Sequence, residues 1–487
     1  MEAVAQFFGF QEKGTNFARE ARGGLTTFLA MVYILAVNPS ILSAAGMPAE
    51  GVFAATVISS AFACIYMGLR ANLPIALAPG MGLNAYFAYT VCGAMGKDWH
   101  MAITAVFVEG VVFLIMNFFK IREKIFNAIP DDLRKAVSMG IGFFIALIGL
   151  INAKIVMENS GTTIGHVNFR GGTFANGVAY DAFDVGITAF LALIGILIVG
   201  ALVAMEVRGA ILIGIVITWI LGIVAELLGI YVPNPDIGMY STIPSGIFGI
   251  SHMSQLSTTA FGLDFSYLAT GEFWAVVFAF LFVDIFDTIG TLTGCAIQGN
   301  LIDKDGNVKN MSKALEADAV GTIAGSLLGT STVTSYVEST SGIADGARTG
   351  FASVVTGLLF VLSMFFSPLF LSVPSFATAP ALVAVGMMMI RGSAKEINWK
   401  DYTKALPAFL TMIMMPFAYS IATGIAYGFV SFTVIHLIVG EHTVETTEYM
   451  RKHKVYKEIT QNTRDSLNPA LIILTILFII KFIWFGN

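Results

Sequence analysis

The sequence predicts an all-α polytopic membrane protein, because it is too apolar for a soluble fold and its apolar stretches recur along the whole chain. Of its 487 residues, 56% are hydrophobic and only 12% are charged, and the mean hydropathy is +0.78. Roughly a quarter of the residues of a soluble domain are charged. The apolar stretches have about the 20 residues that cross a bilayer core, and they leave no room for a sizeable soluble domain.

Fourteen apolar segments are predicted to cross the membrane, in two sets of seven. The first set lies near residues 24–45, 50–70, 80–96, 100–119, 132–154, 184–204 and 209–230. The second set lies near residues 272–294, 314–329, 337–346, 349–371, 375–391, 404–421 and 423–440. A last apolar segment, 469–486, follows a polar connection and either crosses the membrane or lies at its surface.

The distribution of basic residues predicts the orientation. If the N-terminus is cytoplasmic, the Lys and Arg residues of 120–135 and 451–464 fall in cytoplasmic connections, whereas the connection 231–271 on the opposite side has neither Lys nor Arg. Cytoplasmic loops carry an excess of Lys and Arg. Segment 1–23 lacks the pattern of a cleaved signal peptide. We therefore expect an integral protein of the plasma (inner) membrane with a cytoplasmic N-terminus.

Two segments cannot form full membrane helices. NLPIALAPGMGL, residues 72–83, has two prolines and two glycines, and GTSTVTSYV, residues 329–337, is rich in hydroxyl and β-branched side chains. Each begins the third span of its set, and because seven is odd the two sets are inverted relative to each other. Paired interruptions of this kind indicate the central site of a transporter, since irregular backbone at membrane depth must be covered by protein or line a cavity. The alternative is a coincidence of two unrelated loops.

Few ionisable side chains fall at membrane depth, where a charge costs about 3 kcal/mol on insertion scales. Asp284 and Asp287 lie mid-span at a spacing that places both on one helix face, and Glu338 lies where the second interruption meets a half-helix. Asn84 follows the first interruption and either caps a half-helix or contacts a ligand. Glu109 is alone in its span, and we interpret it as a structural hydrogen-bonding group between helices.

This group of acids favours a transport site for a neutral ligand. With no Lys or Arg predicted inside the membrane, the carboxylates must be protonated, hydrated or bound to hydrogen-bond donors. The N-termini of two half-helices alone suit an anion, but acceptor-only carboxylates favour a neutral ligand rich in N–H groups. Crowding and desolvation also favour the protonated form of one acid. We therefore expect a co-transported proton and no other cofactor.

Two alternatives stay open, and other classes of site have no support. One alternative is an anion carrier of the sulfate or bicarbonate type. The other is an intramembrane aspartate-dependent enzyme, which requires acids on two different helices. Cys64, Cys92 and Cys295 show no paired spacing, so neither a disulfide nor a metal site is expected. No basic cluster with interleaved aromatic residues indicates a nucleic-acid partner.

Four stretches carry a resemblance to a known family: GGLTTFLAMVYILAVNPSIL (23–42), ALAPGMGLNAYFAYT (76–90), VDIFDTIGTLTG (283–294) and TSTVTSYVESTSGIADGARTG (330–350). The chain resembles, over essentially its whole length, the AzgA-like branch of the nucleobase–cation symporter-2 family. Members of that branch are permeases for adenine, guanine and hypoxanthine. The resemblance implies fourteen spans in two inverted seven-helix repeats, with short antiparallel strands that interrupt spans 3 and 10, and a homodimer.

The resemblance also implies a core domain that moves against a gate domain in an elevator-type mechanism. The core domain would comprise 24–120 and 272–371, and the gate domain 121–230 and 372–440. The remaining parts are the cytoplasmic N-terminus (1–23), an extracellular connection (231–271), and a cytoplasmic connection with the C-terminal apolar segment (441–487).

The residues that match the family motifs define an expected site. The expected substrate-binding residues are Asn84, Asp284, Val337, Glu338 and Ser339, and the expected proton-coupling residues are Asp287 and Glu338. Of the two aspartates, the resemblance favours Asp284 as the ligand of the base and Asp287 as the proton site. The opposite assignment stays open, because the xanthine and uracil branches align their one acid with Asp287.

The expected substrate is a purine base, with guanine and hypoxanthine favoured over adenine. The N1–H and 2-amino groups of guanine form a donor edge that one carboxylate accepts with both oxygens. Hypoxanthine offers one donor there, and adenine offers a donor beside an acceptor. Ser339 stands where the uracil and xanthine branches carry Asn or Gln, which argues against those two bases.

Overall fold

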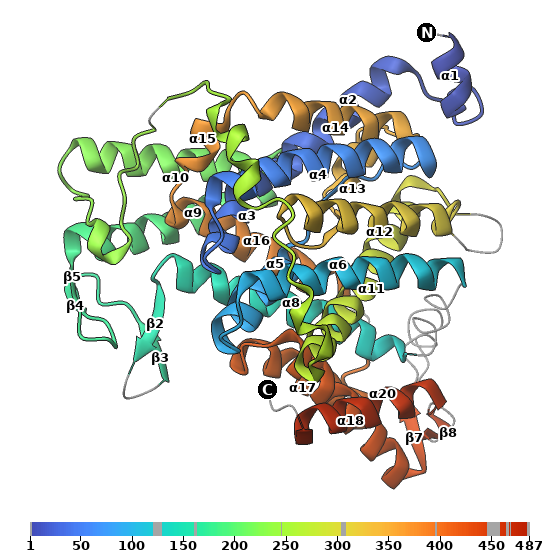
Figure 1. Cartoon of the computed structure of the whole chain (residues 1–487). Coiled ribbons are helices and arrows are strands. Elements are labelled where there is room, and N and C mark those ends of the chain that lie inside the picture. The colour runs from blue at the N-terminus through green and yellow to red at the C-terminus, as the bar shows by residue number, and fades with distance from the viewer. Residues whose placement is uncertain are drawn as a thin grey trace.

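The structure is a computed structural model that describes residues 2–119, 129–159, 163–244, 246–302, 308–394, 397–445, 458–463, 467 and 469–484. Some basic residues that support the predicted orientation lie outside these described residues, at 120–128, 303–307, 395–396, 446–457 and 464–466, as does the end of the apolar segment 469–486. The described chain is mostly helical (Figure 1), which confirms the predicted fold class.

The first half of the chain forms helices separated by one short strand and two hairpins. The helices are α1 (Glu2–Phe8), α2 (Phe17–Met31), α3 (Ile34–Ser43), α4 (Ala49–Arg70), α5 (Met81–Ala85), the π-helix η1 (Tyr86–Ala94), α6 (Trp99–Phe118), α8 (Asp131–Asn152), the π-helix η2 (Ala182–Gly186), α9 (Ile187–Ala204) and α10 (Ala210–Leu227). The strands are β1 (Leu77–Pro79), β2 (Val156–Asn159), β3 (Thr163–His166), β4 (Gly171–Thr173) and β5 (Ala179–Asp181).

The second half begins with three 3-10 helices in the long connection, η3 (Pro235–Ile237), η4 (Ser251–Thr258) and η5 (Phe265–Ala269). The helices that follow are α11 (Gly271–Gly299), α12 (Met311–Leu328), α13 (Ser339–Ala344), α14 (Gly350–Ser363), α15 (Ser367–Leu371), α16 (Ser375–Ser393), α17 (Tyr402–Phe417), α18 (Ile421–Val439) and α20 (Pro469–Trp484). The strands are β6 (Val333–Ser335), β7 (Glu441–Glu445) and β8 (Glu458–Asn462).

Most helices lie within a few residues of the predicted spans, but two spans differ. The first begins at Phe17 and is interrupted by a turn at Val32 and Tyr33. The predicted span 349–371 is divided into α14 and α15, because Pro368 is favoured in the first turn of a new helix. Within the described part of the chain, nine helices are long and apolar enough to cross a membrane. The count of fourteen spans stays a prediction.

The helices pack into two groups. In the first, called the α4 group (α2–α6 and α11–α15), α4 packs against α3, α12 and α14. In the second, called the α8 group (α8–α10 and α16–α18), α8 packs against α16 and α17. These groups contain the helices that were assigned to the core and gate domains. Their movement as separate bodies stays a prediction.

Glycines bring backbones into direct contact inside each group. A Cβ on Gly350 of α14 would meet the carbonyl oxygen of Gly68 on α4, and a Cβ on Gly386 of α16 would meet that of Gly142 on α8. Small residues allow such close approach of helices in a membrane. The two groups are therefore each held by a glycine contact between a helix of the first half and a helix of the second.

The short hairpins mark the two ends of the helices (Figure 1). The hairpins β2–β3 and β4–β5, which the sequence analysis did not anticipate, lie at one end, and the N-terminus and the hairpin β7–β8 lie at the other. The last apolar segment forms α20, which packs beside α18, with the hydroxyl oxygens of Thr433 and Thr475 2.8 Å apart. Which end faces the cytoplasm stays a prediction.

Candidate functional site

The two interrupted segments meet and pair. Strands β1 and β6 are antiparallel, with Leu77 opposite Ser335 and Pro79 opposite Val333. The pairing is extended by a hydrogen bond from Gly80 N to Thr332 O (2.9 Å). This pairing satisfies extended backbone at membrane depth and confirms the antiparallel strands implied by the family resemblance.

A cavity of about 890 Å³ lies against these strands, between the α4 group and the α8 group. The α4 group contributes polar lining residues, which include Tyr33, Asp287, Ser335, Tyr336, Glu338, Thr340 and Ser341. Near the strands the α8 group contributes Ser138, which lies beside Asp287, and apolar residues that include Ile141, Ile145, Val385, Met388 and Met389. One wall can therefore form hydrogen bonds to a ligand, and the facing wall can pack against it.

The cavity extends to one end of the helices. It is lined by charged residues from the first turns of α8 and from the connection between α9 and α10, namely Asp131, Arg134, Lys135, Glu206 and Arg208. Arg208 Nη2 lies 2.9 Å from Asp345 Oδ1, which follows α13. At the other end the two groups touch: Thr90 Oγ1 donates to Tyr419 O (2.8 Å) and Asn152 Nδ2 donates to Tyr89 Oη (2.9 Å).

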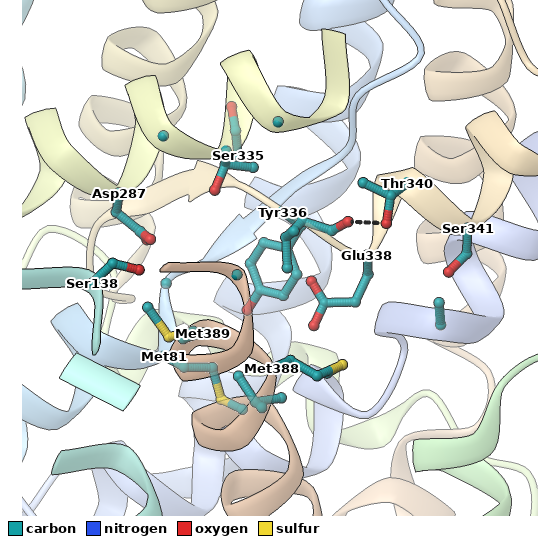
Figure 2. Close-up of a pocket in the computed structure, with 18 of the residues that line it drawn as sticks. Met81, Ser138, Asp287, Ser335, Tyr336, Glu338, Thr340, Ser341, Met388 and Met389 are labelled. Atoms are coloured by element: carbon teal, nitrogen blue, oxygen red, sulfur yellow. Dashed lines mark hydrogen bonds between the residues drawn. The ribbon is translucent and has the colours of Figure 1, made fainter. Parts of the chain in front are cut away.

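Beside the paired strands, the carboxylates of Asp287 and Glu338 face the cavity, as Figure 2 shows. Asp287 projects from α11, and Glu338 projects from the start of α13, on the other side of the Tyr336 ring. Met81, Met388 and Met389 lie along the facing side of this view. The structure thus brings Asp287 and Glu338, which are far apart in the sequence, to one cavity.

Glu338 has a partner that the sequence analysis missed. Tyr33 donates a hydrogen bond of 2.5 Å from its hydroxyl to Glu338 Oε1, and both residues line the cavity. Tyr33 occupies the turn between α2 and α3. The first motif stretch, 23–42, contained this tyrosine, but nothing in a lone tyrosine of an apolar segment indicates its partner.

Asp284, expected to contact the ligand, does not line this cavity. It is fully buried, and Thr288 Oγ1 lies 3.1 Å from its Oδ1. Three residues of helix give a net angular offset of about 60° and a rise of about 4.5 Å. This offset is enough to place Asp284 beside Thr288, which contacts α12 and β6, while Asp287 lines the cavity.

A second acid, Asp318 of α12, completes this buried network. Thr288 Oγ1 lies 2.9 Å from Asp318 Oδ2 and 2.8 Å from Thr334 Oγ1, and Ser335 N donates to Asp318 Oδ1 (3.0 Å). A hydroxyl has one proton to donate. The contacts of Thr288 with both acids are satisfied together when one of the two carboxyl groups carries a proton. The sequence signal for Asp318 is weak. Asp318 lies on the same helix face as Gly321 and Gly325, and that pattern indicates close helix packing rather than a site.

Asn84 and Ser339, which were expected to contact the ligand, instead form hydrogen bonds between the two interrupted segments. Asn84 is buried, does not line the cavity, and accepts a hydrogen bond from the Ser331 hydroxyl through Oδ1. Gly80, not Asn84, is the N-cap of α5, so the capping interpretation of Asn84 is wrong. Ser339 Oγ accepts a hydrogen bond from Ala76 N (3.0 Å). Both side chains therefore link the two interrupted segments.

Val337 and Glu109, the last two residues singled out from the sequence, differ in whether they line the cavity. Val337 is 43% exposed and lines the cavity between Tyr336 and Glu338. Glu109 is fully buried in α6 and lies outside the cavity lining. Val337 can therefore contact a ligand directly, whereas Glu109 cannot.

A helical bundle with a polar cavity between two helix groups, broken helices and buried acids defines the class of membrane transport proteins. Comparison with known proteins is consistent with this class. The sequence profile of the permease family matches residues 19–427. The chain therefore belongs to the nucleobase–cation symporter-2 family of permeases, which are transporters and not enzymes.

Several relatives are similar over nearly their whole length. A permease of Methanocaldococcus jannaschii is 46% identical over 90% of this chain and 94% of its own. The guanine/hypoxanthine permease PbuG of Bacillus subtilis is 42% identical over 89% of this chain and 94% of its own. The adenine permease AdeQ of Escherichia coli is 40% identical over 90% of this chain and 91% of its own.

Solved structures share the fold at low sequence identity. The transmembrane domain of the cyanobacterial bicarbonate transporter BicA has a TM-score of 0.58 and 14% identity, covering 84% of this chain and 97% of that one. SLC26A9 also has a TM-score of 0.58, with 12% identity, covering 93% of this chain and 69% of that one. These similarities show the fold alone.

Proposed function

We propose that this protein is a proton-coupled symporter that imports purine nucleobases, with guanine and hypoxanthine favoured over adenine. The observation that carries the proposal is the placement of Asp287 and Glu338 at one cavity, in a chain related to adenine and guanine/hypoxanthine permeases. Carboxylates accept hydrogen bonds from the N–H groups of a base, and a pair of them suits a neutral donor-rich ligand better than an anion.

The two walls of the cavity suit a flat heterocycle. The polar wall can accept hydrogen bonds from the ring edge. On the facing wall, Met388 and Met389 supply flexible, polarisable side chains that pack well against aromatic rings. Guanine presents two adjacent donors to a carboxylate, and hypoxanthine presents one, so the acceptor-rich wall supports the proposed preference over adenine.

The proton is proposed to bind to the buried acids. Thr288 Oγ1 contacts both Asp284 and Asp318, and these contacts are satisfied together when one of the two carboxyl groups carries a proton. The geometry supports the opposite division of roles from the one favoured by the family resemblance. In this division Asp287 and Glu338 contact the base, and Asp284 holds the proton together with Asp318, linked through Thr288. Strand β6 connects the two sites, since Ser335 contacts Asp318 and lines the cavity.

Alternating access is proposed to follow from a movement of the α4 group against the α8 group. The cavity reaches the end that carries Arg134 and Arg208, which is the predicted cytoplasmic end, and the contacts of Tyr89 and Thr90 close the opposite end. These features correspond to an inward-facing state. In an elevator-type cycle the outer contacts would break as the ligand-bearing α4 group moves outward. A homodimer in the plasma (inner) membrane, with a cytoplasmic N-terminus, completes the proposal.

Uptake into proteoliposomes tests the function. Radiolabelled guanine, hypoxanthine and adenine are supplied with and without an inward-directed proton gradient, and uptake of all three is expected to be driven by the gradient, with adenine the weakest. Purine uptake that ignores the gradient would exclude proton coupling. Absence of any purine uptake, combined with uptake of bicarbonate or sulfate, would replace the proposal with the anion-carrier alternative.

A further inference from the structure

The Glu338 side chain lines the cavity, and the orientation of its carboxylate plane decides which hydrogen bonds it can accept from a ligand. Glu338 is the N-cap residue of α13 and makes no side-chain capping hydrogen bond to that helix. The terminal torsion of a glutamate carboxylate is broad, so the carboxylate plane is not fixed by its own rotamer. Besides a hydrogen bond from its own backbone N–H, the carboxylate depends on contacts from other segments for its orientation.

Tyr33 supplies such a contact. Its hydroxyl donates to Glu338 Oε1 at 2.5 Å, and the tyrosine is 1% exposed, so surrounding residues restrain the ring. Each carboxylate oxygen can accept more than one hydrogen bond. Oε1 can therefore accept from Tyr33 and from a ligand at the same time, while Oε2 stays available for a second donor.

We infer that Tyr33 is a positioning residue for base recognition, whose hydroxyl holds the Glu338 carboxylate in the plane of a purine edge with two adjacent N–H donors. The inference rests on the proposed function and deepens it, because it gives guanine preference a structural cause. A two-point contact requires both oxygens to be aligned with the base, whereas a one-point contact tolerates rotation. Loss of the hydroxyl therefore weakens guanine binding more than hypoxanthine binding.

The substitution Tyr33→Phe tests this inference, with dissociation constants for guanine and hypoxanthine measured separately on purified protein. We expect guanine binding to weaken about tenfold and hypoxanthine binding about threefold or less, within the range of single hydrogen bonds. The ratio of the two constants is the decisive readout. A purely structural role would weaken both bases by the same factor, and an unchanged ratio would overturn the inference.

A control variant and an alternative variant complete this experiment. Tyr86→Phe is the matched control, because Tyr86 is another buried tyrosine of the α4 group that does not line the cavity, and it should leave both constants unchanged. If Tyr33→Phe gives unstable protein, Tyr33→His retains an N–H donor and should keep part of the wild-type preference for guanine over hypoxanthine. Complete loss of that preference in Tyr33→His would contradict the inference. Wild-type protein that binds no purine would instead refute the proposed function itself.

Discussion

Arg208 and Asp345 form an ion pair across the mouth of the cavity, with Arg208 Nη2 2.9 Å from Asp345 Oδ1. Arg208 lies between α9 and α10 of the α8 group, and Asp345 follows α13 of the α4 group. Asp345 is nearly buried and also accepts from the Thr26 hydroxyl (2.8 Å). The pair therefore joins the two groups at the end where the cavity extends.

Breaking the Arg208–Asp345 ion pair should disfavour the state seen in this structure, in which the cavity is open at the end that carries Arg208. Arg208→Gln removes the charge, and because exposed ion pairs contribute about 0.2–1 kcal/mol, the equilibrium constant for the state with the cavity open at this end should fall by roughly 1.4- to 5-fold. The measurement is the rate of maleimide labelling of Ser341→Cys, a cavity residue, in protein whose three native cysteines have been replaced. Labelling should slow.

The control for this prediction is an ion pair inside one group. Arg70 Nε lies 2.9 Å from Glu316 Oε1, and the two residues belong to α4 and α12 of the α4 group. Arg70→Gln should leave the labelling rate unchanged, since no contact between groups is lost. Equal slowing by both substitutions would indicate a general effect of charge rather than a contact between groups.

Glu338→Gln should abolish purine binding while the protein still folds. The amide keeps the size of the side chain but replaces one acceptor oxygen by a donor, which opposes the N–H groups of the base. Since hydrogen bonds to charged groups contribute about 1.5–3 kcal/mol, and an unmatched polar group adds a penalty, affinity should fall by roughly 100-fold or more. Equilibrium binding measures the loss of affinity, and the size-exclusion elution profile of the purified protein checks that it still folds. Wild-type purine affinity of the variant would show that Glu338 is not part of the site.

Asp284→Asn and Asp287→Asn should separate the two proposed roles. Because Asp287 lines the cavity and Asp284 does not, Asp287→Asn should weaken base binding by at least tenfold, the order expected for a lost charged acceptor. Asp284→Asn should leave binding within a factor of about three and remove the response of uptake to a proton gradient. Binding is measured at equilibrium and coupling by gradient-driven uptake. The reverse pattern would restore the assignment favoured by the family resemblance.

Gly350→Ala should destabilise the α4 group. The added methyl would meet the carbonyl oxygen of Gly68, and overpacking of this kind costs about 1–3 kcal/mol. Thermal unfolding in detergent should therefore begin at a lower temperature. Gly200→Ala on α9 is the control, because a Cβ there meets no atom within 4 Å. Equal melting temperatures for Gly350→Ala and wild type would mean that α4 and α14 can separate at little cost.

Local sequence signals were enough to predict the fold class and the two broken segments, whereas their pairing as antiparallel strands was expected from the family resemblance. Prolines and glycines in 72–83 and hydroxyl residues in 329–337 exclude continuous helices, so the positions of β1 and β6 follow closely from the sequence. The turn at Val32 and Tyr33 was not predictable in the same way. It contains neither Gly nor Pro, and tertiary packing determines it.

The site was predicted only in part, because a helix position does not specify what the side chain faces. Asp284 and Asp287 share one turn of α11, yet only Asp287 reaches the cavity. Asp318 of α12 and Tyr33 of the turn between α2 and α3 belong to the expected core domain, but their contacts with Asp284 and Glu338 were not predicted. Their roles depend on contacts between segments some 30 to 305 residues apart, which periodicity within one segment does not encode.

The pairing of β1 with β6 also bears on how the protein is made. Strand β1 is complete at Pro79, but its partner ends at Ser335. The polar backbone of the first broken segment must therefore wait, during synthesis, for more than half of the chain before its hydrogen bonds can form. A chain that ends before β6 therefore lacks the backbone partner that β1 has in the complete fold.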